Sequence, residues 1–138
     1  MILLGTDLVL ETMRPQPSPR LIGWLDRQPA IDLYLSAPSL ADISCAIGRL
    51  RDHARRESLR EAVERLIHGL FSGRVLAFDQ AAALRYGGIV AQRKAVGVRL
   101  SESDAMVAAI ALHHNATLAT GEISGFDGLE LSTVNPFA

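Results

Sequence analysis

The sequence has few of the residues on which several common chemistries depend. Its one cysteine, Cys45, cannot form a disulfide within the chain, so we expect a reducing compartment such as the cytoplasm. We interpret Cys45 as a small buried apolar residue rather than a nucleophile. Four Phe, two Tyr and one Trp are too few for a platform on which bases stack. The longest apolar run, residues 105–112, is too short to cross a bilayer, so no membrane association is expected.

Several short catalytic and binding motifs are also absent. The sequence contains no G-x-S-x-G, no H-E-x-x-H, no GxxxxGK(S/T) and no Cys/His cluster with zinc spacing. His113 and His114 are adjacent on a predicted helix and so diverge by about 100°, which favours solvated helix-end residues over a shared metal. The net charge of −1 gives no overall attraction to nucleic acid. Arginines crowd residues 49–65, but interleaved acids favour a solvated helix face over a phosphate-binding patch.

Short apolar runs alternate with helical patterns along the 138 residues, which is typical of a parallel sheet covered by helices. This length suits a single domain over residues 1–138. A Pro-rich loop at 14–20 precedes a short helix that carries Trp24, and an apolar stripe at 59–70 indicates an amphipathic helix. Further helices are predicted at 79–94 and 104–114. Strands are predicted at 1–5, 32–36, 74–78, 117–120 and 129–134.

Acidic residues stand where predicted strands end or predicted helices begin. Asp7 closes the first strand, Asp42 lies in the first turn of the helix after the second strand, Asp104 opens the apolar helix, and Glu122 comes just after residues 117–120. In open α/β sheets, ligands bind outside the carboxyl ends of the strands. We therefore expect these acids to meet in one pocket that can hold a divalent cation.

Helix capping offers a plainer explanation for two of these acids. Residues 39–42 and 101–104 both match the capping box, in which a Ser and an acid satisfy free amides of the first helical turn. A third match at 58–61 follows no strand, so we expect it to be only a cap. Glu122 fits an ordinary loop acid equally well. Each position taken alone is thus a weak signal, because short motifs have low specificity.

Several segments together match one known pattern: MILLGTD, ETMRPQP, WLD, YLSAPSLADI, GRVLAFD, SESDAMVAAIALHHNATLATGE and VNPF. Over these segments, which cover nearly the whole chain, the sequence resembles the PIN-domain ribonucleases, in particular the toxins of bacterial toxin–antitoxin pairs of the VapC and FitB type. The resemblance implies a three-layer α/β/α sandwich with a mostly parallel sheet of four to five strands. It also implies an endoribonuclease that uses Mg²⁺ or Mn²⁺ to hydrolyse structured RNA, leaving a 5′-phosphate and a 3′-hydroxyl.

The family's site residues carry over with three departures. Its acidic positions fall on Gly5, Asp42, Asp104 and Glu122, and its hydroxyl falls on Thr6. Only Asp104 and Thr6 match as they stand, because Asp42 replaces a longer Glu and Glu122 replaces a shorter Asp. A water between ligand and ion can absorb a change of one methylene. Glycine at position 5 instead removes a full negative charge.

Asp7 stands where the family has Asn. In a strand, residues i and i+2 lie on the same side about 6–7 Å apart, so we expect Asp7 to lend a carboxylate to the pocket from a displaced position. The resemblance then implies that Thr6 positions a ligand or a water. It assigns catalysis and metal binding to Asp42, Asp104 and Glu122, and to these we add Asp7 as a hypothetical further metal ligand of this chain.

Two functions remain open. The first is a metal-dependent ribonuclease toxin, restrained by an antitoxin whose C-terminal segment lays an Arg or an apolar helix into the acidic groove. The second is a PIN fold that has lost catalysis through Gly5 and acts as an antitoxin-binding or DNA-complex partner. The retained acids favour the first, because a pocket freed from metal binding has no need for clustered carboxylates. The resemblance also implies a homodimer, and operator DNA contacted only through the antitoxin. Residues 59–70 or Trp24 would contribute to the dimer surface; the alternative is that both belong to the core.

Overall fold

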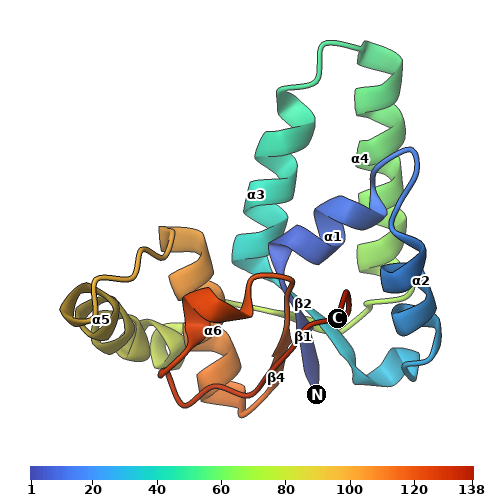
Figure 1. Ribbon diagram of the computed structural model, residues 1–138. Helices are drawn as coiled ribbons and strands as arrows, with labels where there is room; N and C mark the ends of the chain where they lie inside the picture. The colour runs from blue at the N-terminus through green and yellow to red at the C-terminus, as the bar shows by residue number, and fades with distance from the viewer.

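Five short strands form one parallel sheet in the middle of the molecule (Figure 1). The structure is a computed structural model that describes all 138 residues. The order of the strands across the sheet is β3-β2-β1-β4-β5, and every neighbouring pair is parallel. Strand order therefore reverses between β1 and β4, which is where such sheets bind ligands. The strands are β1 (Ile2–Leu4), β2 (Leu33–Ser36), β3 (Val75–Leu76), β4 (Thr117–Ala119) and β5 (Thr133–Val134).

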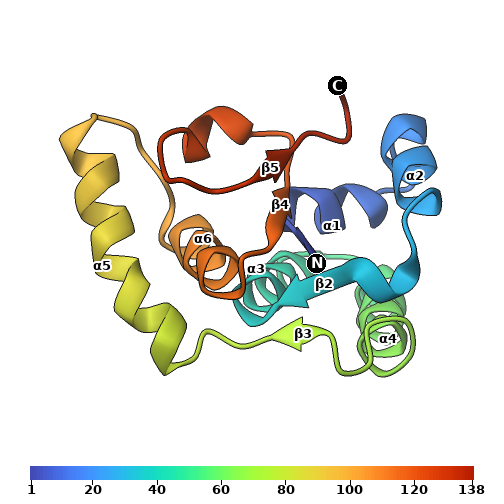
Figure 2. The same ribbon diagram turned by 90° about the horizontal axis from the view of Figure 1, so that it is seen from below.

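Six α-helices cover the two faces of the sheet, as Figure 2 shows. Helices α5 and α6 pack on one face, and helices α1 to α4 pack on the other. This arrangement confirms the predicted three-layer α/β/α sandwich. The helices are α1 (Thr6–Thr12), α2 (Pro19–Asp26), α3 (Ala37–Gly48), α4 (His53–His68), α5 (Gln80–Ala95) and α6 (Glu102–His114), with two 3₁₀ turns, η1 (Ala30–Asp32) and η2 (Ile123–Phe126).

Each face of the sheet has its own apolar core. Neighbouring residues of a strand point to opposite faces, so Leu3 and Leu118 belong to the core under α5 and α6, whereas Leu4 and Ala119 belong to the core under α1 to α4. Helix α6 contributes a run of fully or almost fully buried small residues, which lets it approach both the sheet and α5 closely. Both cores hold the carboxyl ends of β1 and β4 in fixed positions.

Only one of the three expected capping boxes caps a helix. Ser101 is the N-cap of α6, and its Oγ accepts a hydrogen bond from the Asp104 amide at 3.1 Å. Helix α3 instead begins directly after β2 with Ser36 as its N-cap, so Asp42 lies in the second turn rather than the first. The match at 58–61 lies inside α4. The capping-box pattern fails at Ser39 and Ser58 because α3 and α4 begin before these serines. A capping side chain needs the free backbone amides of a first helical turn, and inside a helix those amides are already bonded.

Two predicted strands are much shorter than their apolar runs. In the run 129–134, β5 contains only Thr133–Val134, because Gly128 and Glu130 have φ values of 82° and 57° and cannot be extended there. In the run 74–78, β3 keeps only Val75–Leu76 at the edge of the sheet. The first strand ends at Leu4, so Gly5 and Asp7 lie outside it and the strand spacing assumed for them is wrong.

The helical surfaces confirm some expectations and correct another. Cys45 is exposed, not buried as predicted, because the buried stripe of α3 passes through Ile43 and Ile47 and leaves Cys45 on the opposite side. Helix α4 has no fully buried residue. Its Arg60 and Arg65 are exposed, as predicted, whereas Arg55 and Arg56 are half-buried and donate to backbone carbonyls. Trp24 and the stripe of α4 pack half-buried against the core. None of the helices combines the length and apolar character that crossing a membrane requires.

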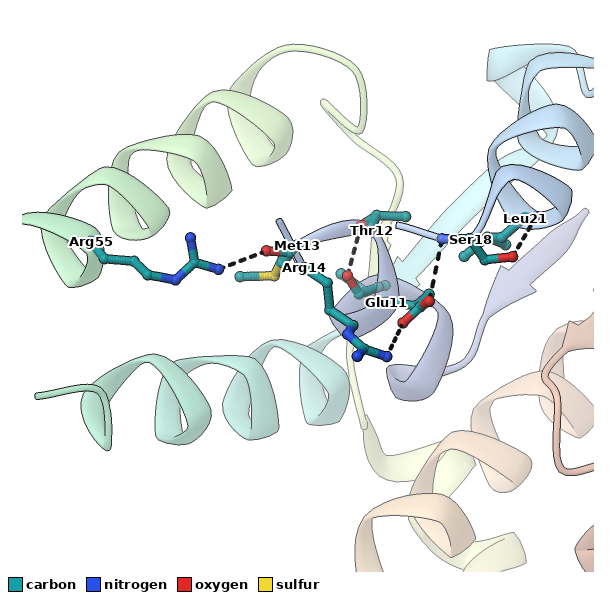
Figure 3. Close-up of polar contacts among 8 residues, drawn as sticks. Glu11, Thr12, Met13, Arg14, Ser18, Leu21 and Arg55 are labelled. Atoms are coloured by element: carbon teal, nitrogen blue, oxygen red, sulfur yellow. Dashed lines mark hydrogen bonds and ion pairs between the residues drawn. The ribbon is translucent and has the colours of Figure 1, made fainter. Parts of the chain in front are cut away.

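The Pro-rich loop after α1 is fastened at both ends (Figure 3). One carboxylate oxygen of Glu11 accepts a hydrogen bond from the Ser18 amide at 3.2 Å, and the other pairs with Arg14 at 3.2 Å. Arg55 of α4 donates to the Met13 carbonyl at 3.2 Å. These contacts fix the C-terminal end of α1, whose first turn carries Asp7.

Candidate active site

The carboxyl ends of β1 and β4 lie side by side and are tied together by their backbones. Gly5 follows β1 as the buried N-cap residue of α1, and its amide donates to the Ala119 carbonyl of β4 at 2.8 Å. Thr120 follows β4 directly, and Glu122 lies two residues further on. Because strand order reverses here, the starts of α1 and of the segment after β4 border a crevice rather than another loop. The expected acids surround this point.

Thr6 begins a chain of buried hydroxyl groups. Its Oγ1 donates to Ser39 Oγ at 2.8 Å, and Ser36 Oγ donates to the same oxygen at 2.9 Å. Ser36 Oγ in turn accepts from the Ser39 amide at 3.1 Å. Both serines are fully buried, so this network fixes the start of α1 against the start of α3. We interpreted Ser39 only as a cap from the sequence and did not identify Ser36.

Asp42 faces the start of α6. Ser103 Oγ donates to Asp42 Oδ2 at 2.5 Å, which joins the second turn of α3 to the first turn of α6. Asp104 is the next residue along α6, and both aspartates are partly buried. The structure therefore brings Asp42 and Asp104 to the same place, although Asp42 arrives from deeper in its helix than the sequence indicated. Ser103 is a contact that no sequence pattern pointed to.

The environment of Asp104 disfavours its charge. Burial is the main reason that the pKa of Asp104 lies above its usual value, and the negative charges of Asp7 and Asp42 raise this pKa further. Hydrogen bonding with Ser101 acts in the opposite direction but does not cancel these effects. The three carboxylates therefore share one electrostatic environment. A cation placed among them would relieve their repulsion.

Asp7 lies in the first turn of α1, and its carboxylate turns back toward β4. Its Oδ2 accepts a hydrogen bond from the Gly121 amide at 2.8 Å. Thr120 Oγ1 donates to both oxygens, at 3.2 and 3.1 Å. The same Thr120 hydroxyl accepts from the Glu122 amide at 3.1 Å. Asp7 thus reaches the crevice through a helical turn and not through the strand geometry expected from the sequence.

Glu122 lies at the outer edge of the crevice. It is exposed, precedes η2, and lines a hollow of about 490 Å³ together with Asp104 and Arg99. Asp104 is therefore the acid that meets all the others: it shares this hollow with Glu122 and shares its electrostatic environment with Asp7 and Asp42. His113 and His114 lie in the last turn of α6, at the far end of the helix from Asp104.

The donors in the crevice suit a hard cation. All are carboxylates and hydroxyls, which prefer Mg²⁺ or Mn²⁺ over softer metals. No three His, Cys, Asp or Glu side chains are arranged to hold one ion together. Mg²⁺ commonly takes one or two protein carboxylates and keeps several waters, so the spacing suits an ion whose remaining contacts pass through water. The residues fit a metal in this partly hydrated form.

Arg93 holds the segment that follows Glu122. This arginine is 4% exposed, and its guanidinium donates to the Gly125 carbonyl at 2.8 Å and to the Asp127 carbonyl. Its Nε donates to the side chain of Gln92 at 2.7 Å. We did not predict this role. Arg93 lies eleven residues after Ala82 on the buried stripe of α5, and a charge on an apolar stripe was the available signal.

Comparisons with known proteins agree with this geometry. The PIN domain family model matches residues 2–124. The toxin FitB of Neisseria gonorrhoeae is 35% identical over 99% of both chains, and a VapC ribonuclease of Sinorhizobium fredii is 31% identical over 99% of this chain and 98% of its own. The crystal structure of FitAcB from Neisseria gonorrhoeae superposes with a TM-score of 0.91 over 99% of both chains at 35% identity. The chain therefore belongs to the PIN-domain family, in the group that contains the FitB and VapC toxins.

Proposed function

We propose that this protein is the ribonuclease toxin of a toxin–antitoxin pair and hydrolyses RNA with a divalent cation held at the ends of β1 and β4. The observation that carries the proposal is Asp104, a partly buried acid at the strand-order reversal that is subject to the charges of Asp7 and Asp42. Structural acids are seldom gathered in this way, because mutual repulsion without a cation lowers stability. The names of the related proteins, a toxin and a ribonuclease, agree with this function.

The carboxylates would hold Mg²⁺ or Mn²⁺. Asp104 is the central donor, Asp42 and Glu122 approach it from α3 and from the segment after β4, and Asp7 adds a fourth carboxylate. When bound, the ion activates a water and offsets the charge that develops on the phosphate and on the leaving oxygen. The same three acids, Asp42, Asp104 and Glu122, are the residues we assign to catalysis.

Two further side chains have defined tasks in this proposal. Thr6 Oγ1 donates a hydrogen bond to Ser39 Oγ, so the lone pairs of Thr6 Oγ1 remain to accept a hydrogen bond from a water or a ligand. Because the buried serines fix this hydroxyl, it needs no reordering when a ligand arrives. Arg99 is exposed in the hollow shared by Asp104 and Glu122, and it offers a positive charge to an RNA phosphate.

The proposed partner is an antitoxin. A complex named FitAB has been solved bound to an IR36 DNA fragment, and one of its chains has a TM-score of 0.91 and 35% identity with this chain. By this likeness, we expect a cognate antitoxin in the cytoplasm, a homodimeric toxin, and operator DNA contacted only through the antitoxin. The acidic crevice suits an Arg from the C-terminal segment of the antitoxin, because charge complementarity would exclude the cation at the same time.

Cleavage of a structured RNA by the purified protein tests the proposal. We expect cleavage with Mg²⁺ or Mn²⁺, none with chelator, and none for Asp104→Asn, which removes the charge and keeps the shape. Asp26→Asn, an exposed acid at the end of α2, is the matched control and should cleave normally. Cleavage that survives in chelator or in Asp104→Asn would contradict the proposal. An inactive native protein would support the alternative of a binding partner that has lost catalysis.

A further inference from the structure

We propose that Gly5 is an accommodation of Asp7 and not simply a lost ligand: the carboxylate of Asp7 takes the place that a side chain at position 5 would occupy. Asp7 then supplies the metal site from α1, and glycine at position 5 is the condition for that. This inference rests on the proposed function and deepens it, because it concerns which residues form the metal site.

The first observation behind this inference is that little space surrounds Gly5. A Cβ added at Gly5 would lie 2.6 Å from Asp7 Oδ1, 3.0 Å from the Ala119 carbonyl oxygen and 3.4 Å from Thr120 Cβ. The Ala119 carbonyl cannot move away, since it pairs with the Gly5 amide across the sheet. Any side chain at position 5 must therefore displace the carboxylate of Asp7.

The backbone of Gly5 excludes the usual reason for a glycine. Its φ and ψ are −66° and 156°, an extended conformation that any residue adopts. No turn at this position requires conformational freedom. What requires glycine is the close approach of the Asp7 carboxylate, so the identities of residues 5 and 7 depend on each other.

The hydrogen bonds of Asp7 leave one acceptor site free on its Oδ1. Oδ2 accepts from both Gly121 and Thr120, whereas Oδ1 accepts from Thr120 alone. Each carboxylate oxygen has two acceptor sites, so Oδ1 keeps one for a cation or for a water bound to it. Oδ1 is also the atom that lies over Gly5. Its position is set by two elements at once, because α1 carries the side chain and the end of β4 orients it.

Charge makes the two positions mutually exclusive as well. Because a Cβ at position 5 would lie 2.6 Å from Asp7 Oδ1, a carboxylate there would lie close to that of Asp7, and in the metal-free protein the two like charges would repel each other. A carboxylate at position 5 is therefore useful only if the one at position 7 is absent. Gly5→Asp on its own should damage the site, although it places an acid where the family has one.

A set of variants separates the steric effect of a side chain at position 5 from the effect of the carboxylate charges at positions 5 and 7. Asp7→Asn removes only the charge, Gly5→Ala adds only a Cβ, Gly5→Asp adds both, and Gly5→Asp with Asp7→Ala moves the acid from one position to the other. Affinity for Mn²⁺ alone is measured by calorimetry on the metal-free protein, with the metal-induced rise in the unfolding temperature as a second readout. Asp26→Asn serves again as the control.

We expect Asp7→Asn, Gly5→Ala and Gly5→Asp each to weaken Mn²⁺ binding by about tenfold or more, and the double variant to return to within about threefold of native affinity. Gly5→Ala keeps every carboxylate, so it tests the idea even if Asp7→Asn folds poorly. Native affinity in both Asp7→Asn and Gly5→Ala would overturn the inference and leave Asp7 as an anchor of the segment after β4. In that case loss of Mn²⁺ binding in Asp104→Asn would still support the proposed function, whereas no Mn²⁺ binding by the native protein would overturn both.

Discussion

Replacement of Arg93 by Lys tests how the segment after Glu122 is held. The arginine is almost fully buried and makes three hydrogen bonds, to Gln92, Gly125 and Asp127. A lysine keeps the charge but loses the planar fork, so it reaches only one of these acceptors well. Hydrogen bonds to charged groups contribute about 1.5–3 kcal/mol each. Two are lost, and water reaches part of this exposed segment, so we expect Arg93→Lys to lower the free energy of unfolding by about 2–4 kcal/mol.

Urea denaturation measures this loss, and thermal unfolding checks it as a decrease of roughly 5–15 °C in the midpoint. Arg85→Lys is the matched control, because Arg85 lies exposed on the same helix and should be replaceable at no cost. Hydrogen exchange gives the location of the effect: the amides of residues 123–128 should exchange faster in Arg93→Lys. A loss below about 0.5 kcal/mol would show that water replaces the guanidinium and would refute the reasoning.

Two other predictions follow from the geometry around Asp104. Ser103→Ala removes the donor that directs Asp42 toward α6, so Mn²⁺ affinity measured by calorimetry should fall about tenfold, while Ser58→Ala, at an exposed serine of α4, should leave it unchanged. The raised pKa of Asp104 means that the metal-free fold binds its proton more tightly than the unfolded chain does. This contribution to stability is complete below the usual Asp pKa of about 3.9 and is lost as pH rises through the folded-state pKa. Metal-free Asp104→Asn should therefore be more stable than native at pH 7 and lose that advantage in acid; a constant difference across pH would contradict this.

Local patterns were sufficient for the elements with long apolar signals. The apolar run and the Ser101 cap placed α6 within two residues of its observed start, and with it the position of Asp104. Alternation of apolar runs and helices was sufficient for the parallel sheet and its two helical layers. Strand lengths were not predictable in the same way. Positive φ values at Gly128 and Glu130 break a run that is apolar enough to be a strand.

Which residue types were available follows from the sequence alone: two acids in the first turn of α6, further acids near strand ends, and a glycine at position 5. How these residues come together depends on the packing of segments that are far apart in the sequence. Asp7 binds the Gly121 amide across 114 positions of sequence, and Ser103 reaches Asp42 across 61. Such pairs exist because the sheet sets β1 beside β4 and packs α3 against α6, and no local periodicity encodes a contact between segments that far apart. The mutual dependence of Gly5 and Asp7 is therefore visible only when the carboxylate is seen in the space that glycine leaves.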